Sequence, residues 1–310
     1  MVDSMSLTEQ HAAGPWPGLP FDEWRETLAT LHMWTQVVGK VRLAQAPLVN
    51  HWWQVPLYVT ARGLTTSAVP YGRRTFQIDF DFKDHRLVIE THDGDARSLQ
   101  LAPRTVADFY GEFTSLMKEL GLEVKIWTTP VEVPDPVPFE QDVEHKSYDP
   151  EYANRFWRAL VQSERVFQQF RSGFEGKCSP VHFFWGSFDL AVTRFSGRRA
   201  PEHPGTPGVP DSITREAYSH EVSSAGFWPG GPALPEPIFY SYAYPEPEGF
   251  NAARVGPGAA YYNNDFKEFV LPYDAVRTSD DPDAALLEFL QATYEAAATH
   301  AHWDRASLER

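Results

Sequence analysis

Apolar residues recur every three to four positions in some stretches of the chain, as in helices, and every second position in others, as in strands. The order of these helix-like and strand-like stretches repeats. Near the N-terminus, apolar side chains three and four residues apart predict a helix around Trp24. At 76–82, phenylalanine and isoleucine alternate with glutamine and aspartate, which predicts a strand with one buried and one exposed face. A capping box at Thr105 predicts a closing helix. The other strands predicted in this half are 51–64, 87–91 and 98–101.

The second half shows the same order of elements. Asp149-Pro150 and Asp281-Pro282 each predict a helix start, because an aspartate cap followed by proline is typical of a first helical turn. The strands predicted between these helices are 181–195, 216–224, 238–244 and 266–271. The predicted fold class is therefore α+β. It has two pseudo-repeated halves, each a helix, about four mostly antiparallel strands and a helix, packed as one compact unit.

Similar residues at corresponding places favour an internal duplication. The tripeptide His-Trp-Trp at 51–53 matches His-Phe-Phe at 182–184. The alternative is that two unrelated halves merely share a common order of elements. Four prolines between 130 and 138 predict a stiff, extended connector. The predicted domains are an N-terminal tail (1–20), a first half (21–128), a Pro-rich connector (129–148) and a second half (149–310).

The predicted strand at 181–195 carries the clearest candidate for a binding site. Alternation places Phe183, Trp185 and Asp189 on one face, where large rings and isolated polar groups mix. Such a mixture is typical of a ligand cavity. Long Gly/Pro-rich loops at 197–212, 226–237 and 245–258 are expected to cover it. The candidate ligand-binding residues are Trp185, Ser187, Asp189, Arg194, Tyr218, His220, Tyr240 and Tyr242.

Each group of candidates has an expected role. Asp189 and His220 are the catalytic candidates, because a carboxylate and an imidazole can move protons or orient a donor. Trp185 and Tyr242 are expected to supply apolar walls, and Arg194 is expected to meet an anion. Arg194 has the opposite parity to Asp189, so its place in the site requires a β-bulge. The set predicts a protein that binds or processes a small molecule.

Two other classes of function stay open. His182, His220 and Glu221 have the side-chain types that bind zinc or iron, which would make the protein a metal-dependent enzyme. Adjacent strand residues point to opposite faces, however, and the chain has no diagnostic His-Glu-x-x-His spacing. The other class is a non-catalytic module whose exposed aromatic residues form a protein interface. The glycine-rich dinucleotide and phosphate motifs do not occur, so the sequence indicates no particular cofactor.

Composition narrows the range of partners. The chain has 310 residues, of which 42% are hydrophobic and 14% aromatic, enough for a core and too many for a disordered protein. Its formal charge of −15 disfavours nucleic acid and anionic membrane surfaces as partners. The single cysteine, Cys178, excludes an intrachain disulfide. No signal peptide or membrane helix is visible. We therefore expect a soluble cytoplasmic protein with a small-molecule ligand, and its oligomeric state stays open.

Several stretches are similar to a known family. They are His-Met-Trp-Thr-Gln at 32–36, Asn-His-Trp-Trp at 50–53, Gly-Leu-Thr-Thr-Ser at 63–67 and, above all, the run at 179–198. Together they resemble an uncharacterised bacterial family, domain of unknown function 5996 (DUF5996), over nearly the whole chain. The resemblance implies a soluble bacterial protein. It implies no activity and assigns no functional residue.

Overall fold

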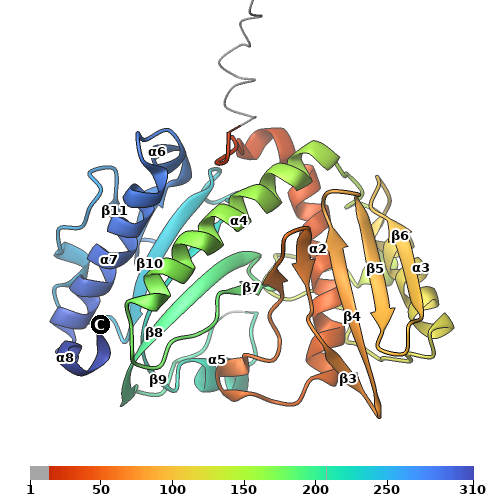
Figure 1. Ribbon diagram of the computed structural model, residues 1–310, viewed down its shortest axis with the longest axis horizontal. Coiled ribbons are helices and arrows are strands. Elements are labelled where there is room, and N and C mark those ends of the chain that lie inside the picture. Colours follow the sequence, from red (N-terminus) through yellow and green to blue (C-terminus); the bar gives the residue numbers. More distant parts are fainter. Residues whose placement is uncertain (1–13, 207) are drawn as a thin grey trace, which may run out of the picture.

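Two antiparallel sheets of six strands each form the centre of the computed structural model, which describes residues 14–206 and 208–310 (Figure 1). The first sheet contains β1 (Tyr58–Val59), β2 (Gly63–Thr65), β3 (Val69–Tyr71), β4 (Arg74–Asp81), β5 (Arg86–Thr91) and β6 (Ala96–Gln100). The second contains β7 (His182–Phe184), β8 (Asp189–Arg199), β9 (His220–Trp228), β10 (Ile238–Tyr244), β11 (Tyr261–Asn263) and β12 (Glu268–Pro272). The strand orders are β1-β2-β4-β5-β6, with β3 beside β4, and β11-β12-β10-β9-β8-β7.

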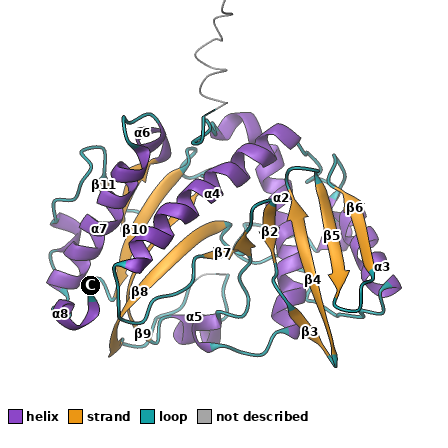
Figure 2. Cartoon of the chain, viewed as in Figure 1, coloured by secondary structure: helices purple, strands orange, loops and turns teal. Residues whose placement is uncertain are grey.

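The two sheets meet edge to edge. Leu57, immediately before β1, pairs with Phe183 of β7, and each backbone N–H donates to the other carbonyl oxygen at 2.9 Å. Helix α4 (Pro150–Ser172) crosses this junction and contacts both β1 and β8. Together with α7 (Pro282–His300), it lies over one face of the second sheet (Figure 2). The two halves therefore form one compact α+β unit, as the sequence predicts.

The helices begin where their capping residues predict. The Asp149 carboxylate accepts hydrogen bonds from two backbone N–H groups in the first turn of α4, and Asp281 accepts one at the start of α7. Thr105 caps α3 (Val106–Glu119) in the same way. The remaining helices are α2 (Phe21–Gln45), α5 (Asp211–Ala217), α6 (Tyr273–Arg277) and α8 (Arg305–Leu308). None of the described helices combines the length and apolar character needed to cross a membrane.

Helix α2 is buried on nearly all sides and serves both halves of the molecule. Trp34 stacks on Phe109 of α3, with ring centroids 4.7 Å apart, and Trp24 packs against Phe156 of α4. The ring of His32 forms a hydrogen bond through Nε2 to the carbonyl of Gly186 at 2.7 Å. The predicted N-terminal helix thus packs against elements of both halves of the chain.

The long strand predicted at 51–64 is wrong. His51 and Trp52 have positive φ angles of 60° and 61° and belong to a short 3₁₀ turn, η1 (Asn50–Trp52). Of the predicted range 51–64, the part after this turn contains only the short strand β1 and the start of β2. The matching tripeptide at 182–184 is a true strand, so the two tripeptides do not occupy equivalent positions. The order of elements agrees with the predicted repeat, whereas this local similarity gives it only loose support.

The single strand predicted at 181–195 is also wrong, because β7 and β8 form a hairpin. Phe188 has a φ of 60°, and its N–H donates to the carbonyl of Phe184 at 2.8 Å to close the turn. Because of this turn, the alternation of side chains between the two faces of the sheet does not run on from β7 into β8. Phe184 pairs with Asp189 and shares its face, while Phe183 points to the core. Similarly, the predicted strand at 216–224 begins only at His220, after α5.

Candidate functional site

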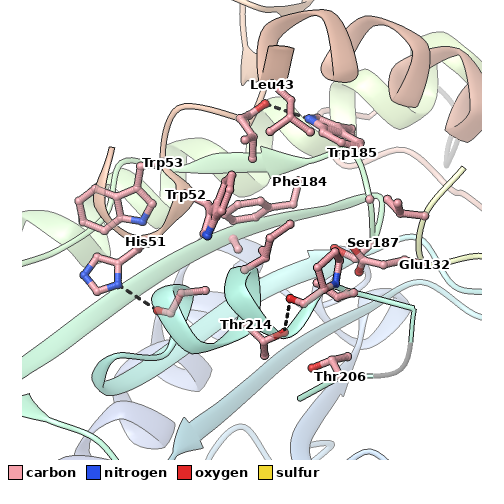
Figure 3. A pocket seen from close by; sticks show the side chains of 18 of the residues that line it. Leu43, His51, Trp52, Trp53, Glu132, Phe184, Trp185, Ser187, Thr206 and Thr214 are labelled. Atoms are coloured by element: carbon pink, nitrogen blue, oxygen red, sulfur yellow. Dashed lines mark hydrogen bonds between the residues drawn. The ribbon is translucent and has the colours of Figure 1, made fainter. Parts of the chain in front are cut away.

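A cavity of about 540 Å³ lies on the face of the second sheet opposite α4 and α7 (Figure 3). Its floor is made by side chains from β8, β9 and β10: Asp189, Ala191, Thr193, Phe195, Val222, Ser224, Tyr240 and Tyr242. Helix α5 and the loop before it cover the floor. The walls come from the end of α2, residues 51–55, the β7–β8 turn and the Pro-rich connector. Both halves of the chain therefore contribute to the cavity.

A buried carboxylate, that of Asp189, is fixed in the floor. Ala191 pairs with Gly226, which pairs in turn with Tyr240 on the next strand. A side chain at position 226 would overlap the Tyr240 hydroxyl, so glycine allows the tyrosine ring to lie across β9. Tyr240 then donates to Asp189 Oδ2, while Ser187 Oγ donates to Oδ1 at 2.5 Å. Burial raises the pKa of Asp189 above its ordinary value.

A hydrogen bond between two tyrosine hydroxyl groups joins the segment that covers the cavity to the sheet that forms its floor. Tyr218 directly follows α5, and its hydroxyl oxygen lies 2.8 Å from that of Tyr242. Beside them, the hydroxyl groups of Thr193 and Ser224 lie 2.9 Å apart. Burial holds the pKa of Tyr242 well above its ordinary value, so this hydroxyl keeps its proton. The floor thus offers neutral hydroxyl groups next to the one fixed carboxyl group.

Glu132 adds a second carboxyl group from the connector. The side-chain amide of Gln36 in α2 accepts a hydrogen bond from the backbone N–H of Val131 at 2.9 Å and donates one to the carbonyl of Val131 at 2.8 Å. Lys40 donates to the carbonyl of Thr129 at 2.6 Å. These bonds fix Glu132, whose φ is 56°, with its carboxylate against Gly186. Glu132 is an exposed residue whose side chain lines the edge of the cavity. Desolvation of its carboxyl group, together with the charge of Asp189, raises its pKa to about 7.

Glu268 of β12 lies near the same carboxyl groups. The register that pairs Ser241 with Phe269 places Glu268 opposite Tyr242 on the cavity side of the sheet. Burial and the negative charge of Asp189 raise the pKa of Glu268 to about 8. Among the described residues, no ion pair joins Glu132, Asp189 or Glu268 to a lysine, arginine or histidine.

The other end of the cavity is aromatic. His51 donates from Nδ1 to the carbonyl of Ala217 at 2.9 Å and accepts at Nε2 from the Lys177 ammonium at 2.6 Å, so its ring is neutral. Burial lowers the pKa of His51, in agreement with that state. The indole N–H of Trp52 is buried with no partner in the described part of the chain. Consecutive residues with positive φ at 51 and 52 are a form of backbone strain that recurs at binding sites.

Trp185 forms part of the wall and packs against α2. Its indole N–H donates to the carbonyl of Val55 at 2.9 Å, and its ring lies directly on Gly39. A methyl group at position 39 would overlap this ring. The glycine in α2 therefore makes the space that the tryptophan occupies.

Gly39→Ala is expected to lower the free energy of unfolding by about 1–3 kcal/mol, because the indole must leave its site and its bond to Val55. Equilibrium denaturation in urea measures this cost. Gly111→Ala, in the middle of α3 where a Cβ meets no neighbour, is the matched control. It should raise stability by about 0.5–1 kcal/mol, since alanine favours a helix. A neutral effect at position 39 would contradict the packing described.

The predicted site residues separate into two groups. The residues Trp185, Ser187, Asp189, Tyr218, Tyr240 and Tyr242 line the cavity. Arg194 points to the opposite face, where its guanidinium carbon lies 3.5 Å from the Phe170 ring centroid and 4.3 Å from that of Tyr294. A register shift does occur in β8, but only between Phe195 and Arg199, too late to turn Arg194 inward. His220 lies beside His51, with ring centroids 5.7 Å apart, and is not part of the lining.

The metal candidates do not come together. His182 is fully buried beside Trp53 and Tyr58, and neither ring nitrogen has a hydrogen-bond partner. Glu221 instead binds Arg198, at 2.7 Å. Across residues 14–206 and 208–310, no group of three histidine, cysteine or acidic side chains has an arrangement suited to a metal ion. Sequence reasoning missed Glu132, because the connector was interpreted as a spacer; the charged residue between Val131 and Val133 was the available signal.

Comparison with protein families decides the classification. The family model described as a family of unknown function (DUF5996) matches residues 16–310. The chain belongs to the DUF5996 family. No curated protein and no solved structure matches it. The DUF5996 match spans both halves and the connector, so every residue of the cavity lies inside the matched region.

Proposed function

We propose that this DUF5996 protein binds a small organic molecule in the cavity, with a polar group of that molecule placed against Asp189. The observation that carries the proposal is the Asp189 carboxylate, held by Ser187 and Tyr240 at the floor of a cavity lined in part by aromatic rings. A cavity of about 540 Å³ lies within the range of known ligand sites. Apolar walls with a few fixed polar groups are what such sites need for affinity and orientation.

The physical setting proposed for this function is a bacterial cytoplasm. The single Cys178 supports a reducing compartment, and the resemblance to a bacterial family supports the source. The formal charge of −15 argues against nucleic acid and against anionic lipid as partners. These features support binding of a dissolved small molecule.

Ala191→Trp tests the proposal, because Ala191 lies in the middle of the floor and an indole there would occupy the centre of the cavity. We expect native mass spectrometry of the wild-type protein, purified from cell extract, to show a bound small molecule that the variant lacks. Ala96→Trp is the matched control, since it is an exposed strand alanine on the first sheet. It should retain the molecule. Equal retention by the wild type and Ala191→Trp would refute the proposal.

A further inference from the structure

We infer that the cavity takes an organic cation, an amine attached to an aromatic or aliphatic body, with its nitrogen between Asp189 and Glu132. This inference rests on the proposed function, because it names the ligand class for the same cavity. It stands on three observations taken together: a partly open cavity of about 540 Å³, aromatic rings in its lining, and carboxyl groups at one end with no cationic partner among the described residues.

The unbalanced charge distinguishes this site from the other buried carboxylates of the chain. Asp81 is equally buried, and Arg62 forms an ion pair with it at 2.8 Å. Asp142, also buried, binds His145 at 2.7 Å. The side-chain partners of Asp189 among the described residues are the hydroxyl groups of Ser187 and Tyr240, and Glu132 and a further glutamate lie nearby. A buried carboxylate normally has a positive partner, and a cationic ligand would supply it here.

The rings around the cavity suit the same ligand. Figure 3 shows Ser187 and Glu132 side by side at one end, with Trp52 and Phe184 facing the space toward the other. A cation near the face of tryptophan or tyrosine is attracted by the ring, and more strongly where water is excluded. The rings toward the far end can therefore hold the apolar body of an amine, while Tyr240 lies beside Asp189 at the end that takes the charged group.

An anionic ligand is the competing interpretation, because Lys40 and Lys125 also line the cavity. The Lys40 ammonium already donates to Thr129 and lies 4.8 Å from the Trp127 ring centroid. Burial lowers its pKa to about 8, so the surroundings do not stabilise its charge, although the ammonium is still mostly protonated at pH 7. An anion in the cavity would also meet the repulsion of Asp189 and Glu132. The charges of the site therefore favour a cation.

The cation should compete with protons. Without a ligand, the pKa of Glu132 is raised to about 7 and that of Glu268 to about 8. An adjacent positive charge stabilises the ionised carboxylates, so binding releases protons. The affinity for an amine should therefore rise as the pH increases from about 6 to 8, while a neutral molecule of the same shape shows no such rise.

The test uses matched probes built on phenyl, indole and cyclohexyl groups, each as an ethylamine, an ethanol and a carboxylate. Isothermal titration gives Kd for the full-length protein and three variants. We expect an amine to bind at least about tenfold more tightly than its alcohol, since a charged hydrogen bond is stronger than a neutral one. Asp189→Asn should weaken amine binding about 10–100-fold and alcohol binding less than about twofold. Glu132→Gln should reduce the pH dependence, and Ala191→Trp should abolish binding.

The outcomes separate the ligand class from the binding function. If alcohols or carboxylates bind as tightly as the amines and Ala191→Trp removes that binding, the inference of a cationic ligand is refuted, while the proposed binding function is supported. If no probe binds and the wild type carries no molecule that Ala191→Trp lacks, both proposals are wrong. Should Asp189→Asn fail to fold, Glu132→Gln still tests the ligand class. Glu132 lines the cavity, and its carboxylate has no hydrogen-bond partner among the described residues whose loss could unfold the protein. An unchanged pH dependence and Kd in that variant would overturn the inference.

Discussion

Phe183→Ala is expected to lower the free energy of unfolding by about 3–5 kcal/mol, the cost of emptying a well-packed aromatic site. The Phe183 side chain is fully buried. Its ring centroid lies 5.2 Å from that of Phe188 and 6.2 Å from that of Phe156 in α4. Its backbone also forms the bridge to Leu57 that joins the two sheets. The substitution therefore empties the core next to the backbone bridge that joins the two sheets.

Phe184→Ala is the matched control, because the neighbouring phenylalanine lies on the opposite face and is only half-buried in the cavity wall. We expect it to cost about 1 kcal/mol and to alter ligand binding instead. Chemical denaturation monitored by circular dichroism compares the two variants. Equal costs, or a larger cost at Phe184, would contradict the hairpin and its register.

Acidification from pH 6.5 towards pH 3 is expected to destabilise the protein by up to about 4 kcal/mol through His182 alone. Burial, with the charges of Arg42 and Arg171, lowers the pKa of folded His182 to about 3, against 6.5 for the free side chain. Between these two values the unfolded chain binds the proton and the folded chain does not. Stability is therefore full above about pH 6.5 and falls as the pH decreases through that window.

His182→Phe should flatten this part of the stability curve. The variant is also expected to be slightly more stable at pH 7.5, since both ring nitrogens of His182 are buried without a partner and phenylalanine has none to satisfy. Denaturation midpoints for the wild type and the variant at pH 7.5, 6, 5 and 4 measure both effects. The pH 7.5 pair serves as the control, because histidine is neutral there in both states. Parallel curves would show that His182 does not carry the acid sensitivity.

The helices were predictable because their signals are local. Asp149, Thr105 and Asp281 mark helix starts through bonds to backbone groups two or three residues away, which need no knowledge of the rest of the fold. The strand at Phe76–Phe82 was predictable for a similar reason, since its apolar face is core and most of the polar residues on its other face are only half-buried. Here β4 covers Arg74–Asp81, within two residues of the prediction.

The turns could not be predicted from the same pattern. His51, Trp52 and Phe188 adopt positive φ angles that bulky residues rarely adopt, and packing around them, not local preference, holds them there. A prediction that extends the alternation through both turns therefore places Phe183 on the wrong face. It remained correct within β8 and β10, where Asp189, Tyr240 and Tyr242 all face the cavity. The charged residue between Val131 and Val133 hinted at Glu132, but its place beside the cavity depends on tertiary contacts of the connector with α2, which the local pattern does not encode.

The shared construction of the cavity has a consequence for the evolution of the family. The floor is encoded by the second half of the chain, whereas α2 and the turn at 50–53 come from the first, and Glu132 comes from the segment between them. A gene fragment for either half would encode only part of the cavity. Recombination between relatives could transfer the complete cavity only by exchanging the region from α2 to β10 as one inherited block.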